Sequence, residues 1–101
     1  METADQLFRL EGKVALVTGG YGGIGQTVCR GLAQAGAKIA IAGQSLEKAA
    51  AFAKVLEAEG HTSHAAAFNV LSVSETIRMF DDVANRFGRL DILVNLVGLN
   101  H

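Results

Sequence analysis

The amino-acid sequence predicts an α/β fold, in which helices cover both faces of a doubly wound parallel sheet. Short apolar segments alternate with longer segments of helical periodicity, in the order strand, helix, strand, helix, strand, helix, strand. The first, second and fourth of the short segments are apolar on both faces, as buried parallel strands are. A cluster of glycines follows the first segment, where the chain must turn sharply from strand into helix.

The first strand is predicted over residues 13–18 (KVALVT), and the glycine turn occupies residues 19–25 (GGYGGIG). A helix then continues to Gly36, because glycine commonly ends helices. Its expected buried face is formed by apolar residues at helical spacing, namely Ile24, Val28, Leu32 and Ala35.

The second strand is predicted over residues 38–42 (KIAIA), and Ser45 is expected to cap a helix over residues 46–59. Gly60 ends this helix. Its expected apolar face comprises Ala49, Phe52, Ala53 and Leu56. Residues 64–68 (HAAAF) are assigned to a third strand from the alternation of elements, since alanine itself favours helices.

The third helix is predicted to start at Ser72, which forms a capping box with Glu75, and to end at Gly88. Its expected buried stripe is Val73, Ile77, Phe80, Val83, Ala84 and Phe87. The fourth strand covers residues 92–97 (ILVNLV). A doubly wound sheet places this strand beside the first, so we expect the strand order 3-2-1-4 and a bare apolar edge.

Composition excludes several classes of protein. The chain has 101 residues, which allows one small domain at most. Nine basic and ten acidic residues give a net charge of -1, so neither a nucleic acid nor a membrane surface is an expected partner. The single cysteine, Cys29, excludes a disulfide framework, and His61 and His64 lack further ligands for a metal ion. There is neither an apolar run of ~18 residues nor a basic, apolar leader, and a cytoplasmic location is expected.

The glycine turn is the strongest candidate for a binding site. Glycines let the backbone approach an anion closely, and the helix N-terminus that follows directs N–H groups towards it, which favours a phosphate. The P-loop pattern is nearly met, but Gln26 replaces its lysine. The dinucleotide pattern G-x-G-x-x-G is met by Gly20, Gly22 and Gly25. The acidic residue that this pattern expects after the second strand is replaced by Gly43. A flexible turn without a ligand is the alternative interpretation.

A third pattern, T-G-x-x-x-G-I-G over residues 18–25, resembles the short-chain dehydrogenase/reductase family. The preceding segment, residues 12–18 (GKVALVT), is similar to the same family. Residues 91–98 (DILVNLVG) stand where the family has N-N-A-G, with Asn95 and Gly98 matching and residues 96 and 97 departing. The pair Asn69-Val70 stands for the family's aspartate and hydrophobic residue after the third strand. The resemblance covers residues 12–98 and implies a Rossmann-type, NAD(P)-binding fold.

The resemblance also implies roles for single residues. Gly19, Gly23, Ile24 and Gly25 would surround the cofactor pyrophosphate, with Tyr21 and Gly22 on the same turn. Asn69 would contact adenine, with capping of the strand end as the alternative role, and Val70 beside it is counted with the cofactor-binding residues. Asn95 would be buried and tie neighbouring backbone together, and Gly98 would leave room for the nicotinamide ribose. Gly43, Gln44 and Ser45 occupy the place where the family distinguishes NAD from NADP. An aspartate there would repel a 2′-phosphate, and its absence gives a slight preference for NADP.

No catalytic residue is assigned, because the family's Tyr-x-x-x-Lys motif does not occur in the chain. We therefore expect residues 1–101 to be the NAD(P)-binding half-domain of an oxidoreductase, truncated after the fourth strand and inactive alone. By resemblance, the whole enzyme would transfer hydride to or from a small alcohol or carbonyl compound and form a homo-oligomer. The alternative is a non-catalytic nucleotide-binding or interaction module that another chain completes.

Overall fold

The computed structural model describes residues 9–67 and 72–96, and these form one four-stranded parallel sheet. The strands are β1 (Val14–Thr18), β2 (Lys38–Gly43), β3 (Ser63–Ala67) and β4 (Ile92–Asn95). Their order in the sheet is β3-β2-β1-β4, which confirms the predicted fold class and strand order. The predicted ends of the third and fourth strands, Phe68 and Val97, lie outside the described residues.

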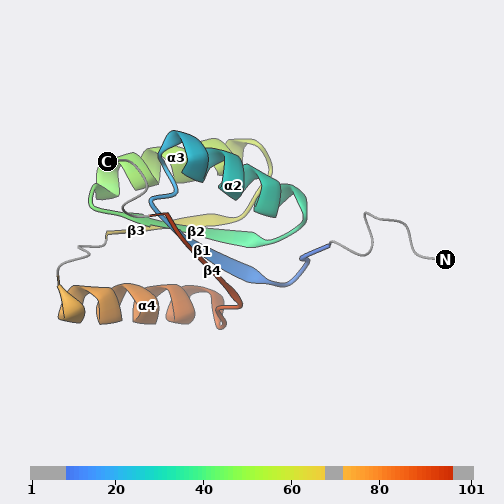
Figure 1. Ribbon diagram of the computed structural model, residues 1–101. Coiled ribbons are helices and arrows are strands. Elements are labelled where there is room, and N and C mark those ends of the chain that lie inside the picture. The colour runs from blue at the N-terminus through green and yellow to red at the C-terminus, as the bar shows by residue number, and fades with distance from the viewer. Residues whose placement is uncertain (1–8, 68–71, 97–101) are drawn as a thin grey trace.

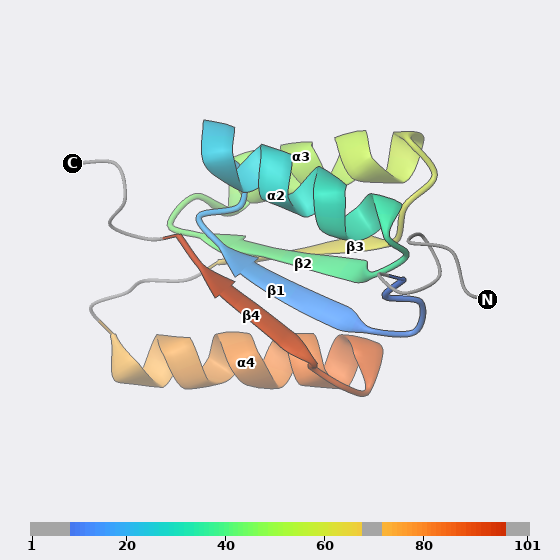
Figure 2. The ribbon, with the colours of Figure 1, turned by 45° about the vertical axis from the view of Figure 1, so that its right-hand side comes forward.

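Helices lie on both faces of this sheet (Figures 1 and 2). The helices α2 (Gly23–Gln34) and α3 (Leu46–Ala58) lie on one face, and α4 (Val73–Phe87) lies on the other. Because side chains alternate along a strand, β1 contributes to both of the resulting cores. Ala15 and Val17 pack under α2 and α3, while Val14 and Leu16 pack towards α4.

Serine caps begin two of the helices, as predicted. The Ser45 hydroxyl accepts a hydrogen bond from the Lys48 amide at 3.2 Å, and the Ser72 hydroxyl accepts one from the Glu75 amide at 3.3 Å. The buried face of α3 also agrees with the prediction, because its buried residues are Ala49, Phe52, Ala53 and Leu56.

The buried face of α2 differs from the prediction. Its buried residues are Gly25, Cys29 and Ala33, whereas Ile24 is 56% exposed. The predicted Val28, Leu32 and Ala35 are half-buried. The cause is the small size of the residues that face the sheet, which lets this helix lie close to the strands.

The buried face of α4 also differs in part. Met79 and Val83 are buried, and Phe80 and Phe87 pack beside them. Met79 is buried although it is not part of the predicted stripe, whereas the predicted Ile77 is exposed. The helix is rotated accordingly. The predicted stripe residues on its outer flank are therefore exposed, namely Val73, Ile77 and Ala84.

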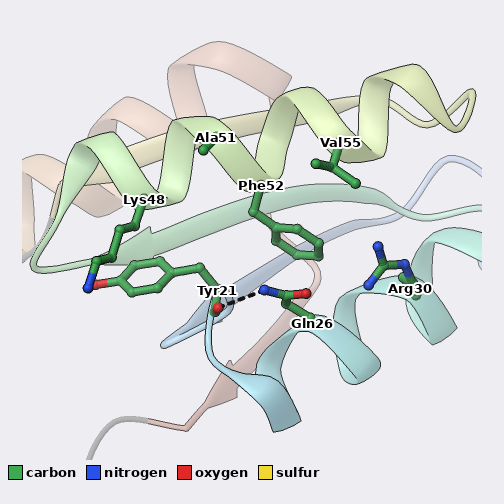
Figure 3. A pocket seen from close by; sticks show the side chains of 7 residues that line it. All are labelled: Tyr21, Gln26, Arg30, Lys48, Ala51, Phe52 and Val55. Carbon is green, nitrogen blue, oxygen red and sulfur yellow. Dashed lines mark hydrogen bonds between the residues drawn. The ribbon is translucent and has the colours of Figure 1, made fainter.

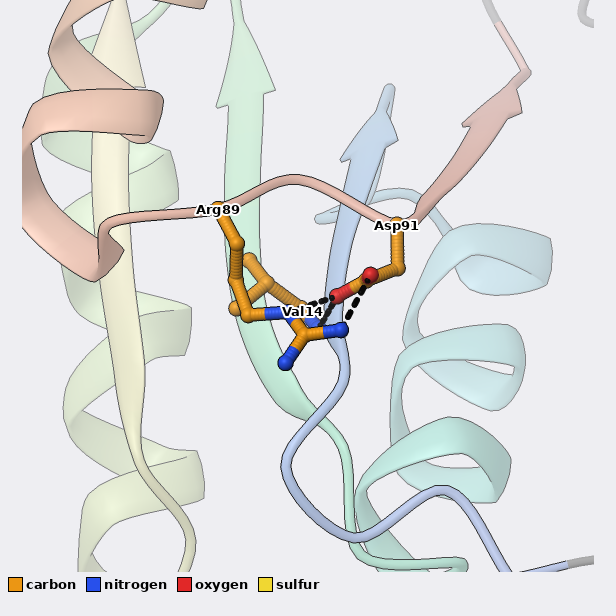
Figure 4. Close-up of polar contacts among 3 residues, drawn as sticks. All are labelled: Val14, Arg89 and Asp91. Carbon is orange, nitrogen blue, oxygen red and sulfur yellow. Dashed lines mark hydrogen bonds and ion pairs between the residues drawn. The ribbon is translucent and has the colours of Figure 1, made fainter.

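Side chains join β1 to the edge strand β4 at both ends. At the start of the strands, the Asp91 carboxylate accepts a 2.9 Å hydrogen bond from the Val14 amide and pairs with Arg89 (Figure 4). At the carboxyl ends, the Thr18 hydroxyl donates to Asn95 Oδ1 at 2.7 Å. The expectation that Asn95 is buried is wrong: the residue is exposed, and β4 forms the edge of the described sheet.

Candidate functional site

The candidate site lies at the carboxyl ends of β1 and β2, where the glycine turn joins β1 to α2. Gly19 has a positive φ of 78°, a conformation that glycine adopts without a steric penalty. The Gly19 amide donates to the Ala42 carbonyl at 2.8 Å, and the Gly22 amide donates to the Gly19 carbonyl at 3.3 Å. These two bonds hold the turn over the end of the sheet and direct α2 away from it.

The turn and the start of α2 fit together so closely that a side chain is excluded. A Cβ atom added at Gly25 would lie 2.3 Å from the Gly19 carbonyl oxygen and 2.6 Å from Gly20 Cα. A Cβ atom at Gly20 would lie 3.1 Å from the Val17 carbonyl oxygen and 3.2 Å from Cys29 Sγ. Only a chain with glycine at position 25 can therefore bring the first turn of α2 this close to the end of β1.

The N-terminus of α2 is better suited to bind an anion than the N-termini of α3 and α4. Its N-cap is Gly22, which makes no side-chain capping bond, and its first turn holds no acidic residue. The other two helices in the described part of the chain have serine caps and an acidic residue in the first turn. The first-turn amides of α2 thus lack an intrahelical or capping acceptor, and the helix dipole adds positive potential there.

Tyr21 closes one side of the site. Its hydroxyl accepts a 3.2 Å hydrogen bond from the Ser45 amide, and its own carbonyl accepts a 2.9 Å bond from Gln26 Nε2. Its ring covers Gly43 at the end of β2, and a Cβ atom added at Gly43 would lie 2.2 Å from Tyr21 Cε1. The sequence analysis missed this contact. The pairing of Thr18 with Ala42 brings the loops that follow β1 and β2 side by side. No sequence pattern, however, predicts the direction in which the Tyr21 ring points.

An open cavity of about 350 Å³ lies beside Tyr21, between α2 and α3 (Figure 3). Its cations are Arg30 and Lys48. The Arg30 guanidinium lies 5.4 Å from the centre of the Phe52 ring and pairs with Glu59 at 3.2 Å. Lys48 lies in the first turn of α3. Because Tyr21 is part of the glycine turn and also lines this cavity, the cavity adjoins the candidate site.

The structure brings most of the predicted binding residues together at the carboxyl ends of the strands. Nine of them lie in or next to the turn and the strand ends: Gly19, Tyr21, Gly22, Gly23, Ile24, Gly25, Gln44, Ser45 and Asn95. Asn69, Val70 and Gly98 lie outside the described residues.

Cys29, on α2, packs against the glycine turn. Its side chain is fully buried, with Sγ 3.8 Å from the Gly20 carbonyl oxygen. Burial raises the pKa of the thiol to about 12, and the nearby Arg30 charge opposes this only in part. Cys29 is therefore a packing residue, as expected. Within residues 9–67 and 72–96, no group of three or more His, Cys, Asp or Glu could hold a metal ion. The helices in the same residues lack the combination of length and hydrophobicity that a transmembrane helix needs.

Comparison with known proteins connects this geometry to a family. A family model described as short chain dehydrogenase matches residues 13–101. The 3-oxoacyl-[acyl-carrier-protein] reductase FabG of Aquifex aeolicus is 38% identical over 92 residues, which cover 90% of this chain and 37% of that protein. The chain thus spans about a third of the length of the curated relatives it matches.

Solved structures agree in fold and sequence. A gluconate 5-dehydrogenase from Burkholderia cenocepacia, in complex with NADP and tartrate, is 42% identical with a TM-score of 0.83. The match covers 90% of this chain and 36% of that protein. A Pseudomonas aeruginosa RhlG/NADP active-site complex is 38% identical with a TM-score of 0.76, covering 87% of this chain and 35% of the other.

Proposed function

The chain belongs to the short-chain dehydrogenase family, and from this we propose that residues 1–101 form the NAD(P)-binding part of an oxidoreductase. The observation that carries the proposal is the N-terminus of α2, which has no side-chain cap. It lies close to the glycine turn because Gly25 has no side chain to keep the two apart. Phosphate groups bind at such a helix N-terminus because the amides donate to their oxygens and the dipole favours negative charge. The pyrophosphate of a dinucleotide fits this chemistry.

The residues present fit a dinucleotide better than a nucleoside triphosphate. Gln26 carries no charge, so the turn lacks the lysine with which a P-loop contacts terminal phosphates. The turn stands at the carboxyl edge of a parallel sheet, where open α/β sheets bind their ligands. Two solved relatives hold NADP, which supports a nicotinamide dinucleotide as the ligand here.

A bound nicotinamide dinucleotide would supply the hydride donor or acceptor. The amides of Gly23, Ile24 and Gly25 would bind and orient its pyrophosphate. Gln44 and Ser45 stand where the adenosine ribose would be recognised. The reaction proposed for the whole protein is hydride transfer to or from a small alcohol or carbonyl compound, in a homo-oligomer and in the cytoplasm.

A slight preference for NADP is part of the proposal. Positions 43–45, the last residue of β2 and the two after it, hold no acidic residue, so no carboxylate repels a 2′-phosphate there. The first turn of α3 carries one acid, Glu47, and one cation, Lys48, so its charge favours neither cofactor strongly.

Isothermal titration calorimetry tests this proposal. The whole protein is titrated with NADP⁺ and, separately, with NAD⁺. We expect saturable binding of both, with NADP⁺ bound a few-fold more tightly. The Gly25→Ala variant should lose affinity for both, since its methyl group would force α2 away from the turn. The matched Gly31→Ala variant lies on the same helix with nothing within 4 Å of its Cβ position, and it should bind as the wild type does. Wild-type protein that binds neither dinucleotide at millimolar concentration would refute the proposal.

A further inference from the structure

The ring of Tyr21 occupies the space that a side chain at position 43 would need. A Cβ atom at Gly43 would lie 2.2 Å from Tyr21 Cε1 and 2.7 Å from both Cζ and the hydroxyl oxygen. Real Cβ atoms essentially never make contacts this short, so one group must move. The glycine at position 43 and the tyrosine at position 21 are therefore a matched pair, although they lie 22 positions apart in the chain.

The ring is held in this place by two interactions. Its hydroxyl accepts the Ser45 amide hydrogen at 3.2 Å, and Ser45 in turn caps α3. The partly buried ring also packs against the hydrophobic core between the sheet and the two helices. Moving the ring would break the bond to Ser45 and expose apolar surface, so the ring does not yield freely.

We propose that Tyr21 is a specificity-determining residue of the dinucleotide site, because its ring leaves no room for a side chain, acidic ones included, at position 43 at the end of β2. A carboxylate at position 43 would accept hydrogen bonds from the ribose hydroxyls and repel a 2′-phosphate. With Tyr21 in place, the ribose meets the uncharged edge of a phenol ring instead. Cofactor choice is then set jointly by positions 21 and 43. This inference rests on the proposed function.

A double-mutant cycle in the whole protein tests the coupling between positions 21 and 43. The variants are Tyr21→Ala, Gly43→Asp and the double variant, each titrated calorimetrically with NAD⁺ and NADP⁺. We expect Gly43→Asp alone to weaken both dinucleotides by similar factors of about tenfold, because the tyrosine ring and the carboxylate cannot both fit. We expect the double variant to shift the ratio of dissociation constants towards NAD⁺ by about tenfold or more.

Three further variants separate the causes. Gly43→Ala adds the Cβ atom without charge, and Tyr21→Ala should restore its cofactor binding. Tyr21→Phe keeps the ring and removes the hydroxyl, so Tyr21→Phe combined with Gly43→Asp should behave like Gly43→Asp alone. Gly31→Ala controls for the general effect of replacing a glycine. Circular dichroism confirms that each variant is folded before titration, and Gly43→Ala keeps the steric test available if an aspartate variant does not fold.

The outcomes are distinguishable. If Gly43→Asp alone changes the preference as much as the double variant, the ring is no obstacle and the inference is wrong. Equal cofactor ratios in the double variant and the wild type would also overturn it. If the wild type binds neither dinucleotide, the proposed function itself fails.

Discussion

Replacing Gly25 by alanine tests the close contact between the glycine turn and α2. The added methyl group would lie 2.3 Å from the Gly19 carbonyl oxygen and 2.6 Å from Gly20 Cα. Both neighbours are backbone atoms and cannot rotate away. Forcing extra atoms into a packed site costs about 1–3 kcal/mol, whereas glycine to alanine inside a helix gains at most about 1 kcal/mol. We expect the free energy of unfolding to fall by about 1–2 kcal/mol.

Gly31→Ala is the matched control, because it makes the same chemical change on the same helix with nothing within 4 Å of the new atom. It should raise the free energy of unfolding by about 0.5–1 kcal/mol. Urea denaturation of both variants, followed by circular dichroism, measures the difference, which should be about 1.5–3 kcal/mol. A difference of less than about 0.5 kcal/mol between the two variants would show that the turn and the helix are not in the close contact described.

Three other features give predictions of their own. Hydrogen bonds from Arg89 and then from the Val14 amide lower the pKa of Asp91, so its stabilisation is present above the ordinary value of 3.8 and is lost as pH falls through the lower folded value. The difference in urea midpoint between wild type and Asp91→Asn should therefore shrink below pH 3.8, and a constant difference would contradict the charge-based role. Cys29, with a pKa of about 12, should react with a thiol reagent only after unfolding, and labelling of the folded protein as fast as free cysteine would contradict its burial. Ser45→Ala should cost about 1 kcal/mol in urea denaturation through loss of the α3 cap, with Ser45→Gly costing only a few tenths.

The fold could be predicted because the local signals agreed with one another. The face of α3 followed from helical spacing between Ser45, which caps it, and Gly60. The strand order followed from the alternation of elements and the rule for doubly wound sheets. These signals are short-range or topological, and the sequence carries them directly.

Features that depend on close packing could not be predicted. Helical spacing of large apolar residues does not predict the face of α2, because Gly25 and Ala33 are small and still face the sheet. The same spacing predicts Ile77 in the buried stripe of α4 and does not include Met79, which packing against the sheet buries. The contact of Tyr21 with Gly43 depends on the register of β1 and β2 and on one side-chain torsion, and a sequence pattern specifies neither.

A crystal structure of the protein grown with NADP⁺ would show directly where the dinucleotide binds. We expect its pyrophosphate to accept hydrogen bonds from the amides of Gly23, Ile24 and Gly25 at the N-terminus of α2, with the adenosine ribose beside Tyr21 and Ser45. A dinucleotide bound elsewhere, with these amides still facing solvent at saturation, would contradict it.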